Sequence, residues 1–207
     1  MYIPKQFENT NIELLQGFIE QHSFMTIISH ANDSPVISHI PVALDKTQGK
    51  FGVLRWHVAK LNPHATLFSE GRPAVCVFQG PHAYISPSWY AGKENVPTWN
   101  YAVLHAHGIP QPISQMKLAD DLTHMVRYYE SLKKHGEPYS VSSDFKAKLI
   151  EHIVGFEMEI ISLEAKFKLS QNRKQADQES LIQGLLAENT PDTIALATLM
   201  QSLNPSL

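Results

Sequence analysis

The spacing of hydrophobic residues predicts that the chain opens with a helix and continues into strands. Thr10 followed by Glu13 is typical of the capping box that begins a helix. The predicted helix buries one face, formed by Ile12, Leu15, Phe18 and Ile19. Residues 24–30 are then rich in β-formers, and residues 31–35 are typical of a turn.

Two further strands are predicted over residues 36–44 and 50–58, joined by a turn. Side chains of a strand alternate between its faces, so the second of these strands has an apolar face and a face that carries Arg55 and His57. The apolar face consists of Gly52, Leu54, Trp56 and Val58. This pattern predicts a sheet with one side against a core.

The middle of the chain predicts a short helix and then two long strands. Asn62 is a helix cap with proline behind it, and Gly71 ends the helix. Residues 74–78 form an apolar run, which predicts a strand buried on both faces. Residues 79–108 are interpreted as strand, loop and strand.

The second half of the chain predicts more helix. A helical stripe predicts a helix within residues 112–135, ended by Gly136, and a shorter helix over 143–154. Residues 155–169 predict one long strand, in which the apolar side chains change parity near Ile161, as at a β-bulge. Two helices are predicted to close the chain, over 175–187 and from Thr190 onward.

These elements predict an α+β fold. Short turns rather than helical crossovers join most strands, so the sheet is expected to be mostly antiparallel. A small barrel of roughly six strands would remove the exposed sheet edges.

Composition narrows the classes of protein that fit this pattern. The chain has 207 residues, of which 43% are hydrophobic and 18% are charged, which excludes a disordered or fibrous protein. We expect no membrane contact, because no stretch is long and apolar enough for a membrane helix. The single cysteine, Cys76, excludes an internal disulfide and predicts a cytoplasmic protein. The net charge of −3 gives no indication of broad nucleic-acid binding.

Four segments carry side chains that could bind a ligand. In residues 77–90, Gln79 ends a buried strand, and Gly80 would allow a flat ligand to approach the backbone; a packed aromatic loop explains the same segment equally well. Residues 57–63 and 168–173 carry donors that suit a phosphate, although a plain helix cap and a solvated turn are the alternatives.

The fourth segment, residues 96–108, contains aromatic and imidazole groups. Trp99 and Tyr101 would point to one side of a strand and Asn100 to the other. His105 and His107 would share a face, which is a geometry that metal sites use, but no carboxylate or cysteine motif accompanies them and we expect no metal. No nucleotide-binding, zinc-protease or serine-hydrolase motif is present, so the sequence assigns no catalytic residue and leaves enzymatic activity open.

Several segments together resemble the PaiB-type family of FMN-binding negative transcriptional regulators. The resemblance starts at residues 2–4 with Phe7 and ends at residues 168–173, and so covers nearly the whole chain. Its longest blocks are 78–86 with 88–90 and 96–101; shorter matches are Asn62-Pro63 and residues 153–156.

The resemblance implies a split β-barrel related to flavin reductases and pyridoxamine-phosphate oxidases, built as a homodimer with FMN at the subunit interface. It implies a split-barrel domain over residues 1–173, with inserted helices at about 112–154, and a helical appendage over 174–207. It also implies a link to repression of sporulation and protease genes. The implied cofactor-binding residues are His57, Val58, Lys60, Asn62, Gln79, Gly80, His82, Trp99, Asn100, Tyr101, Lys168, Ser170, Gln171 and Asn172.

Donor chemistry divides these residues by role. The phosphate donors are expected near the first turn (His57, Lys60, Asn62) and near the last (Lys168, Ser170, Gln171). Gln79 and Gly80 would face the flavin ring, and Trp99 or Tyr101 would stack on it.

The chain departs from the family pattern at three places, the third being its acidic C-terminal helices, and leaves other functions open. His64-Ala65-Thr66 replaces a segment that often holds an aromatic residue and an arginine, and residues 105–108 replace a His-x-Tyr-Gly motif. A flavin-reductase-like oxidoreductase is one alternative, and a haem-binding split barrel with His105 or His82 as axial ligand is another. The closing helices carry no Lys or Arg after Lys174, so direct DNA binding, although a possibility for a regulator, is not supported by charge.

Overall fold

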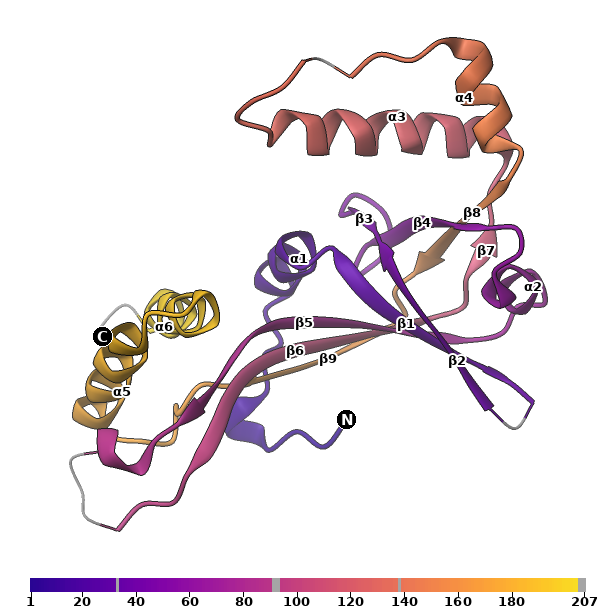
Figure 1. Ribbon diagram of the computed structural model, residues 1–207. Helices are drawn as coiled ribbons and strands as arrows, with labels where there is room; N and C mark the ends of the chain where they lie inside the picture. Colours follow the sequence, from indigo (N-terminus) through magenta and orange to yellow (C-terminus); the bar gives the residue numbers. More distant parts are fainter. Residues whose placement is uncertain (33, 91–93, 138, 205–207) are drawn as a thin grey trace. The chain divides into compact units, whose positions relative to one another are not determined.

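The computed structural model describes residues 1–32, 34–90, 94–137 and 139–204 (Figure 1). The helices within these ranges are α1 (Ile12–Gln21), α2 (Pro63–Ser69), α3 (Gln115–Ser131), α4 (Ser143–Ile150), α5 (Gln175–Glu188) and α6 (Pro191–Leu203), with short 3₁₀ turns at Lys5–Phe7 and Pro87–Trp89. The strands are β1 (Phe24–Ala31), β2 (Ser34–Pro41), β3 (Ala43–Asp45), β4 (Val53–Ala59), β5 (Ala74–Ile85), β6 (Thr98–Gly108), β7 (Gln111–Pro112), β8 (Ile153–Glu159) and β9 (Ser162–Lys168).

The strands form two sheets. The larger sheet has the order β2-β1-β5-β6-β9, and the smaller has the order β3-β4-β8-β7. β1 is antiparallel to both β2 and β5, and β4 is antiparallel to both β3 and β8. The prediction of a mixed fold with antiparallel sheets is therefore confirmed, whereas closure of a barrel stays a prediction.

The chain divides into two compact units. The first contains residues 1–18, 79–105 and 164–207, and the second contains residues 19–78 and 106–163. The predicted division into residues 1–173 and 174–207 stays a prediction.

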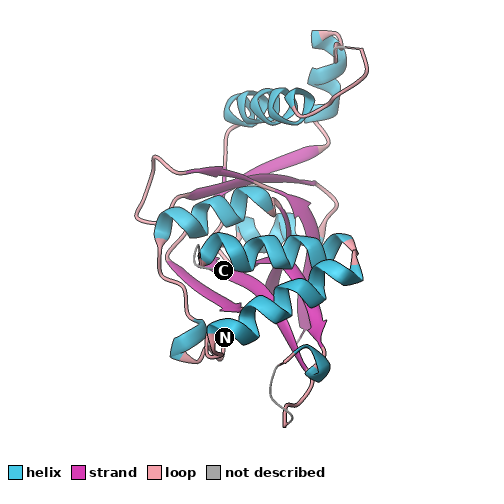
Figure 2. Cartoon of the chain, turned by 90° about the vertical axis from the view of Figure 1, so that its left-hand side faces the viewer, coloured by secondary structure: helices cyan, strands magenta, loops and turns pink. Residues whose placement is uncertain are grey.

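The first unit has a core in which the chain's two ends contribute apolar side chains. Phe18 of α1 packs against Phe167 of β9, with ring centroids 5.0 Å apart. α5 and α6 lie side by side (Figure 2) and bury Leu181, Ile182, Leu185, Leu196 and Met200. Gly184 of α5 allows close approach of Trp89, because an added Cβ would stand 2.5 Å from the indole ring.

The second unit has an aromatic core on the apolar face of β4. Trp56 packs edge-on against Phe68 of α2 at 5.8 Å and stacks on Phe156 of β8 at 6.3 Å. All three side chains are buried. The alternation predicted for this strand is confirmed, since Leu54, Trp56 and Val58 are buried and Arg55 is only partly so.

Two long strands predicted from the sequence are each divided between the sheets. Residues 36–44 were expected to form one strand, but β2 ends at Pro41 and β3 starts at Ala43, with the Val42 amide bonded to Ser23 O at 2.9 Å. Residues 155–169 likewise divide into β8 and β9 at Ile160 and Ile161. The parity change is therefore a change of sheet and not a bulge within one strand.

Several predicted boundaries also need correction. The helix expected over 112–135 is α3, which begins after Ser114 because that hydroxyl caps Lys117 N, and it ends at Ser131, well before Gly136. The run 74–78 is the start of a longer strand, and its Val75 and Val77 are only partly buried. The closing helices occur where they were predicted.

Parts of the predicted segments lie outside the described residues: Asp33 and residues 91–93 of predicted loops, Pro138 of the inserted helical segment, and residues 205–207 of the helical appendage. Within the described ranges, no helix has both the length and the hydropathy needed to cross a membrane. Cys76 is fully buried, as a small apolar side chain would be, and burial raises the pKa of its thiol.

Candidate functional site

Three cations gather where β9 leads into α5 in the first unit. Lys168 is half-buried, and its pKa is lowered by burial and then by the nearby charges of Lys166 and Arg173. The Lys168 ammonium donates to Thr98 Oγ1 at 2.6 Å and to Trp99 O at 2.5 Å. Among the described residues, none of these three cations forms a salt bridge with a carboxylate. A dianionic group such as a phosphate would supply the missing negative charge.

Aromatic rings accompany the cations. Trp99 is 54% exposed; the Tyr84 ring stands edge-on to it at 6.2 Å and the His82 ring lies 6.3 Å away. Lys166 lies over the Tyr101 ring at 5.5 Å, and Arg173 over the Tyr90 ring at 4.8 Å. An exposed indole beside cations that have no carboxylate partner in the described part of the chain suits a ligand that has both a flat ring system and a negative charge.

The turn after β9 is fixed by internal hydrogen bonds. Ser170 has a left-handed backbone (φ +64°), an uncommon conformation for serine, and its Oγ accepts a bond from Asn100 Nδ2 at 2.9 Å. Asn100 is fully buried, while Gln171 accepts from Leu169 N and donates to Phe167 O. Asn100, Ser170 and Gln171 therefore hold the backbone that carries Lys168, and their contact with a cofactor stays a prediction.

The middle of β5 holds another predicted group. Gly80 is buried and Gln79 is exposed, with Gln79 Nε2 3.5 Å from His82 Nδ1. His82 Nδ1 also lies 3.3 Å from Gly80 O. Asn172, which precedes Arg173 in the sequence, is exposed. None of these positions is assigned a role by the geometry alone.

The remaining predicted residues belong to the second unit. Val58 is buried, Lys60 is exposed, and burial lowers the pKa of His57. Asn62 caps α2, because its Oδ1 accepts from His64 N at 2.9 Å while its Nδ2 donates to Ser38 Oγ at 3.2 Å. Both polar atoms of Asn62 are thus used by the protein itself.

His64 stands where the family pattern often differs, and the structure explains what it does. Its side chain is fully buried and stacks on Phe68 at 4.6 Å. Nδ1 lies 2.9 Å from Ser38 Oγ, and Nε2 lies 3.1 Å from Val36 O. His64 is therefore a fully bonded core residue.

Sequence reasoning missed part of the charged and aromatic cluster. Lys166 and Tyr84 were not among the predicted site residues, and Arg173 was indicated only as part of the segment 168–173. Lys166 and Lys168 are two apart in a strand and therefore share a face. The alternation of side chains along this strand was therefore the sequence signal that could have added Lys166 to the site. His105, on β6, lies with Nδ1 3.9 Å from Glu164 Oε2, so a carboxylate does approach a histidine that seemed isolated in the sequence.

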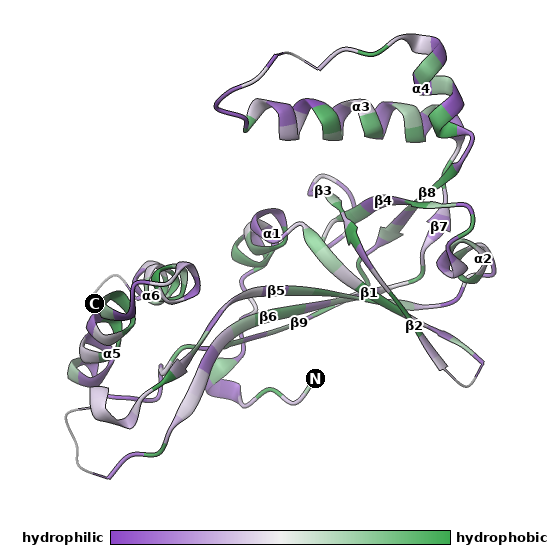
Figure 3. Cartoon of the chain, viewed as in Figure 1, coloured by the Kyte–Doolittle hydropathy of each residue, from purple (hydrophilic) through white to green (hydrophobic). Residues whose placement is uncertain are grey.

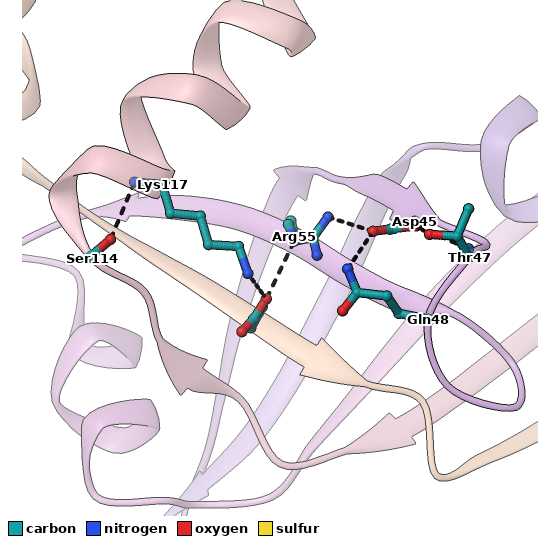
Figure 4. A network of polar contacts seen from close by, with 7 residues as sticks. Asp45, Thr47, Gln48, Arg55, Ser114 and Lys117 are labelled. Atoms are coloured by element: carbon teal, nitrogen blue, oxygen red, sulfur yellow. Dashed lines mark hydrogen bonds and ion pairs between the residues drawn. The ribbon is translucent and has the colours of Figure 1, made fainter.

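A second charged network occupies the smaller sheet (Figure 4). Arg55 donates from Nη1 to Asp45 at 2.9 Å and from Nε to Glu157 at 3.3 Å, and Glu157 also pairs with Lys117. The pKa of Asp45 is lowered to about 2, first by hydrogen bonds from Thr47 and further by Arg55. Every charge named here has an opposite partner, so the network stabilises the sheet rather than offering a binding site.

The comparisons with known proteins agree with the resemblance. Residues 1–162 match the family model described as "Putative FMN-binding domain". The chain is 37% identical over 205 residues to the "Protease synthase and sporulation protein PAI 2" of Bacillus subtilis (strain 168), with 97% of each chain covered. The protein therefore belongs to this family, of the PaiB type.

Solved structures share the fold at low sequence identity. The structure of the FAD and haem binding protein from Mycobacterium smegmatis has a TM-score of 0.60 at 14% identity, covering 88% of this chain and 80% of that one. The flavocytochrome Anf3 from Azotobacter vinelandii has a TM-score of 0.60 at 12% identity, covering 86% and 78%. At such identity the likeness concerns the fold alone.

Proposed function

We propose that this protein binds FMN and that the cation–aromatic cluster of the first unit contributes to the site. The observation that carries the proposal is the group Lys166, Lys168 and Arg173, which lacks carboxylate partners in the described chain and stands beside the exposed Trp99. A phosphate monoester is close to a dianion at neutral pH, and lysine and arginine are its usual partners. Membership of a family described by FMN binding supports the same choice.

The donor set fits each part of the cofactor. Lys168 would hold the phosphate, Trp99 would lie against the flavin ring, and Gln79 with the Gly80 backbone would face the polar edge of the ring. The bound flavin would supply redox chemistry. The protein's own contribution is to hold the lysine by Thr98 and to exclude water from part of its ammonium group.

The biological role we propose is that of a cytoplasmic regulator, acting as a homodimer with a closed split barrel and FMN at the subunit interface. The name of the Bacillus subtilis relative, which refers to protease synthase and sporulation, supports the role in gene control. The chain has a single cysteine, the buried Cys76, which is consistent with a reducing compartment. The domain division proposed is a barrel over 1–173, with inserted helices at about 112–154, and a helical appendage over 174–207.

The test is direct. The purified protein is mixed with equimolar FMN and desalted, and its visible spectrum and flavin fluorescence are recorded. We expect a flavin absorption band near one FMN per subunit with altered fluorescence. Flavin that washes away completely and stays fully fluorescent would refute cofactor binding, and a regulator without flavin would then be the better description.

A further inference from the structure

A large groove in the second unit lies between α3, α4 and the start of β8. Its volume is about 1140 Å³, which exceeds the roughly 300–1000 Å³ typical of small-molecule pockets. Its apolar wall includes Leu122 and Val126 of α3 and Leu149 and Ile150 of α4. A segment of polypeptide fits a space of this size better than a single small ligand does.

The groove exposes apolar side chains that a folded protein usually covers. Leu149 and Tyr139 are each 49% exposed, and both line it. Further large apolar side chains of this helical segment are also exposed: Met116, Tyr128, Leu132 and Phe145. Figure 3 shows hydrophobic and hydrophilic residues interleaved along α3 and α4. Exposed apolar surface of this extent is typical of a protein interface.

The rim of the groove is predominantly basic. Its cations are Arg127, Lys133, Lys134 and Lys146, against the carboxylates of Glu130 and Glu137. Glu130 is already paired with Lys133 at 2.6 Å. His57, His135 and His152 also line the groove. The charge therefore favours an acidic, partly apolar partner.

One segment of this same chain has the complementary character. The α5–α6 turn, taken here as residues 186–194, joins the end of α5 to the start of α6 and exposes two aliphatic side chains, Leu186 (38% exposed) and Ile194 (40% exposed). The carboxylates of Glu188 and Asp192 stand between them in sequence and are exposed. No Lys or Arg occurs after Lys174. This turn presents two apolar and two acidic groups within nine residues.

We infer that the α3–α4 groove receives the α5–α6 turn of a second copy of this chain. A two-fold arrangement would use the contact twice, since each copy offers one groove and one turn. The inference deepens the proposed homodimer by naming a surface that holds it together. It does not depend on the flavin site.

Charge reversal on each side separates this contact from other modes of association. The groove variant carries Lys134→Glu and Lys146→Glu, which spares the Lys133–Glu130 pair. The turn variant carries Glu188→Lys, which reverses one charge, and Asp192→Asn, which removes the other. Lys148→Glu with Lys5→Glu is the matched control, because Lys148 is on α4 and Lys5 near the N-terminus, both are exposed, and neither lines the groove.

Sedimentation velocity over a concentration series, at low and at physiological salt, measures the dimer dissociation constant of each protein. We expect each reversal variant to dimerise at least tenfold more weakly than the wild type, and the control to match the wild type. An equimolar mixture of the groove and turn variants should recover the wild-type constant within about threefold, because a mixed dimer contains one reversed contact and one native contact, both attractive.

Four results would overturn the inference. Wild-type protein that stays monomeric, or reversal variants that dimerise as tightly as the wild type, would exclude the contact. Variants whose dimerisation is weakened, and is not restored when the two are mixed, would show only a loss of folding. Loss of thermal stability without any change in association would show that the substitutions act within one copy and not at a contact between copies. FMN retention, recorded on the same samples, reports separately on the proposed cofactor site.

Discussion

Arg55 is expected to be among the most sensitive charged residues of the second unit. It stands on β4 directly opposite Glu157 of β8, and its guanidinium also reaches Asp45 at the end of β3, so it links three strands of one sheet. Its side chain is only 14% exposed, compared with 19% for Asp45 and 32% for Glu157. We therefore predict that Arg55→Met destabilises the fold by leaving two carboxylates facing each other without their shared cation.

The size of the effect follows from the partners that remain. A hydrogen bond to a charged group contributes about 1.5–3 kcal/mol, and two such bonds are lost. Both carboxylates stay partly solvated, Asp45 keeps Thr47 and Gln48, and Glu157 keeps Lys117. These compensations reduce the expected loss to about 2 kcal/mol, which corresponds to a Tm lower by roughly 4–8 °C for a chain of this size.

Urea unfolding followed by tryptophan fluorescence measures this change, since Trp56 lies one residue from Arg55 in a buried position. The matched control is Lys46→Met, which removes a pair with Glu20 whose side chains are 41% and 43% exposed. Such an exposed pair contributes less than about 1 kcal/mol. An Arg55→Met protein as stable as the Lys46→Met protein would refute the assigned role of the network.

Three further predictions follow from particular contacts. Gly17→Ala should stabilise the protein by about 0.5–1 kcal/mol, because alanine has the higher helix propensity and nothing stands within 4 Å of the added Cβ. Gly184→Ala should destabilise the protein despite the same gain in helix propensity, because its Cβ would meet the Trp89 ring at 2.5 Å. The urea midpoints of the two variants, compared with that of the wild type, test this pair. Asp45 contributes stability that is fully present above its unfolded pKa of 3.8 and is lost as the pH falls toward about 2. Asp45→Asn should therefore flatten the decline in unfolding free energy between pH 4 and 2. A decline as steep as that of the wild type would contradict the lowered pKa of Asp45. Burial lowers the pKa of His64, so its neutral form favours folding above pH 6.5 and this stability is lost as the pH falls below 6.5. His64→Phe should therefore remove this part of the pH dependence of Tm. A pH profile of Tm that is the same in His64→Phe and the wild type would argue against this role of His64.

The helices and most strand positions could be predicted from periodicity because local patterns determine them. The caps at Asn62 and Thr190 illustrate this, since each side chain bonds a backbone amide within three residues. The splitting of residues 36–44 and 155–169 was not predictable in the same way. Whether a strand continues or changes sheet depends on which distant strand offers hydrogen bonds, and the apolar pattern on both sides of Val42 and Ile161 suits either outcome.

The candidate site was predictable only in part, for a similar reason. The sequence indicated Lys168 and Trp99, because they lie in segments that also carry other donors and rings. It did not indicate that Lys168 reaches the backbone of Trp99, or that Lys166 adds its charge to those of Lys168 and Arg173. Residues such as Asn100 and Asn62 looked equally suited to a ligand, yet their polar atoms bond within the protein. Long-range pairing decides which donors remain available.

The central claim is that this protein binds FMN and that its phosphate is held by the Lys168 cluster. The most direct measurement is a fluorescence titration of FMN and of riboflavin, which lacks the phosphate, against the wild-type protein and Lys168→Met, with Lys46→Met as control. We expect the wild type and the control to bind FMN at least tenfold more tightly than riboflavin, since one charge-assisted hydrogen bond contributes about 1.5–3 kcal/mol, and Lys168→Met to lose most of this preference. Equal affinity for FMN and riboflavin in the wild type, or an unchanged preference in Lys168→Met, would contradict the claim.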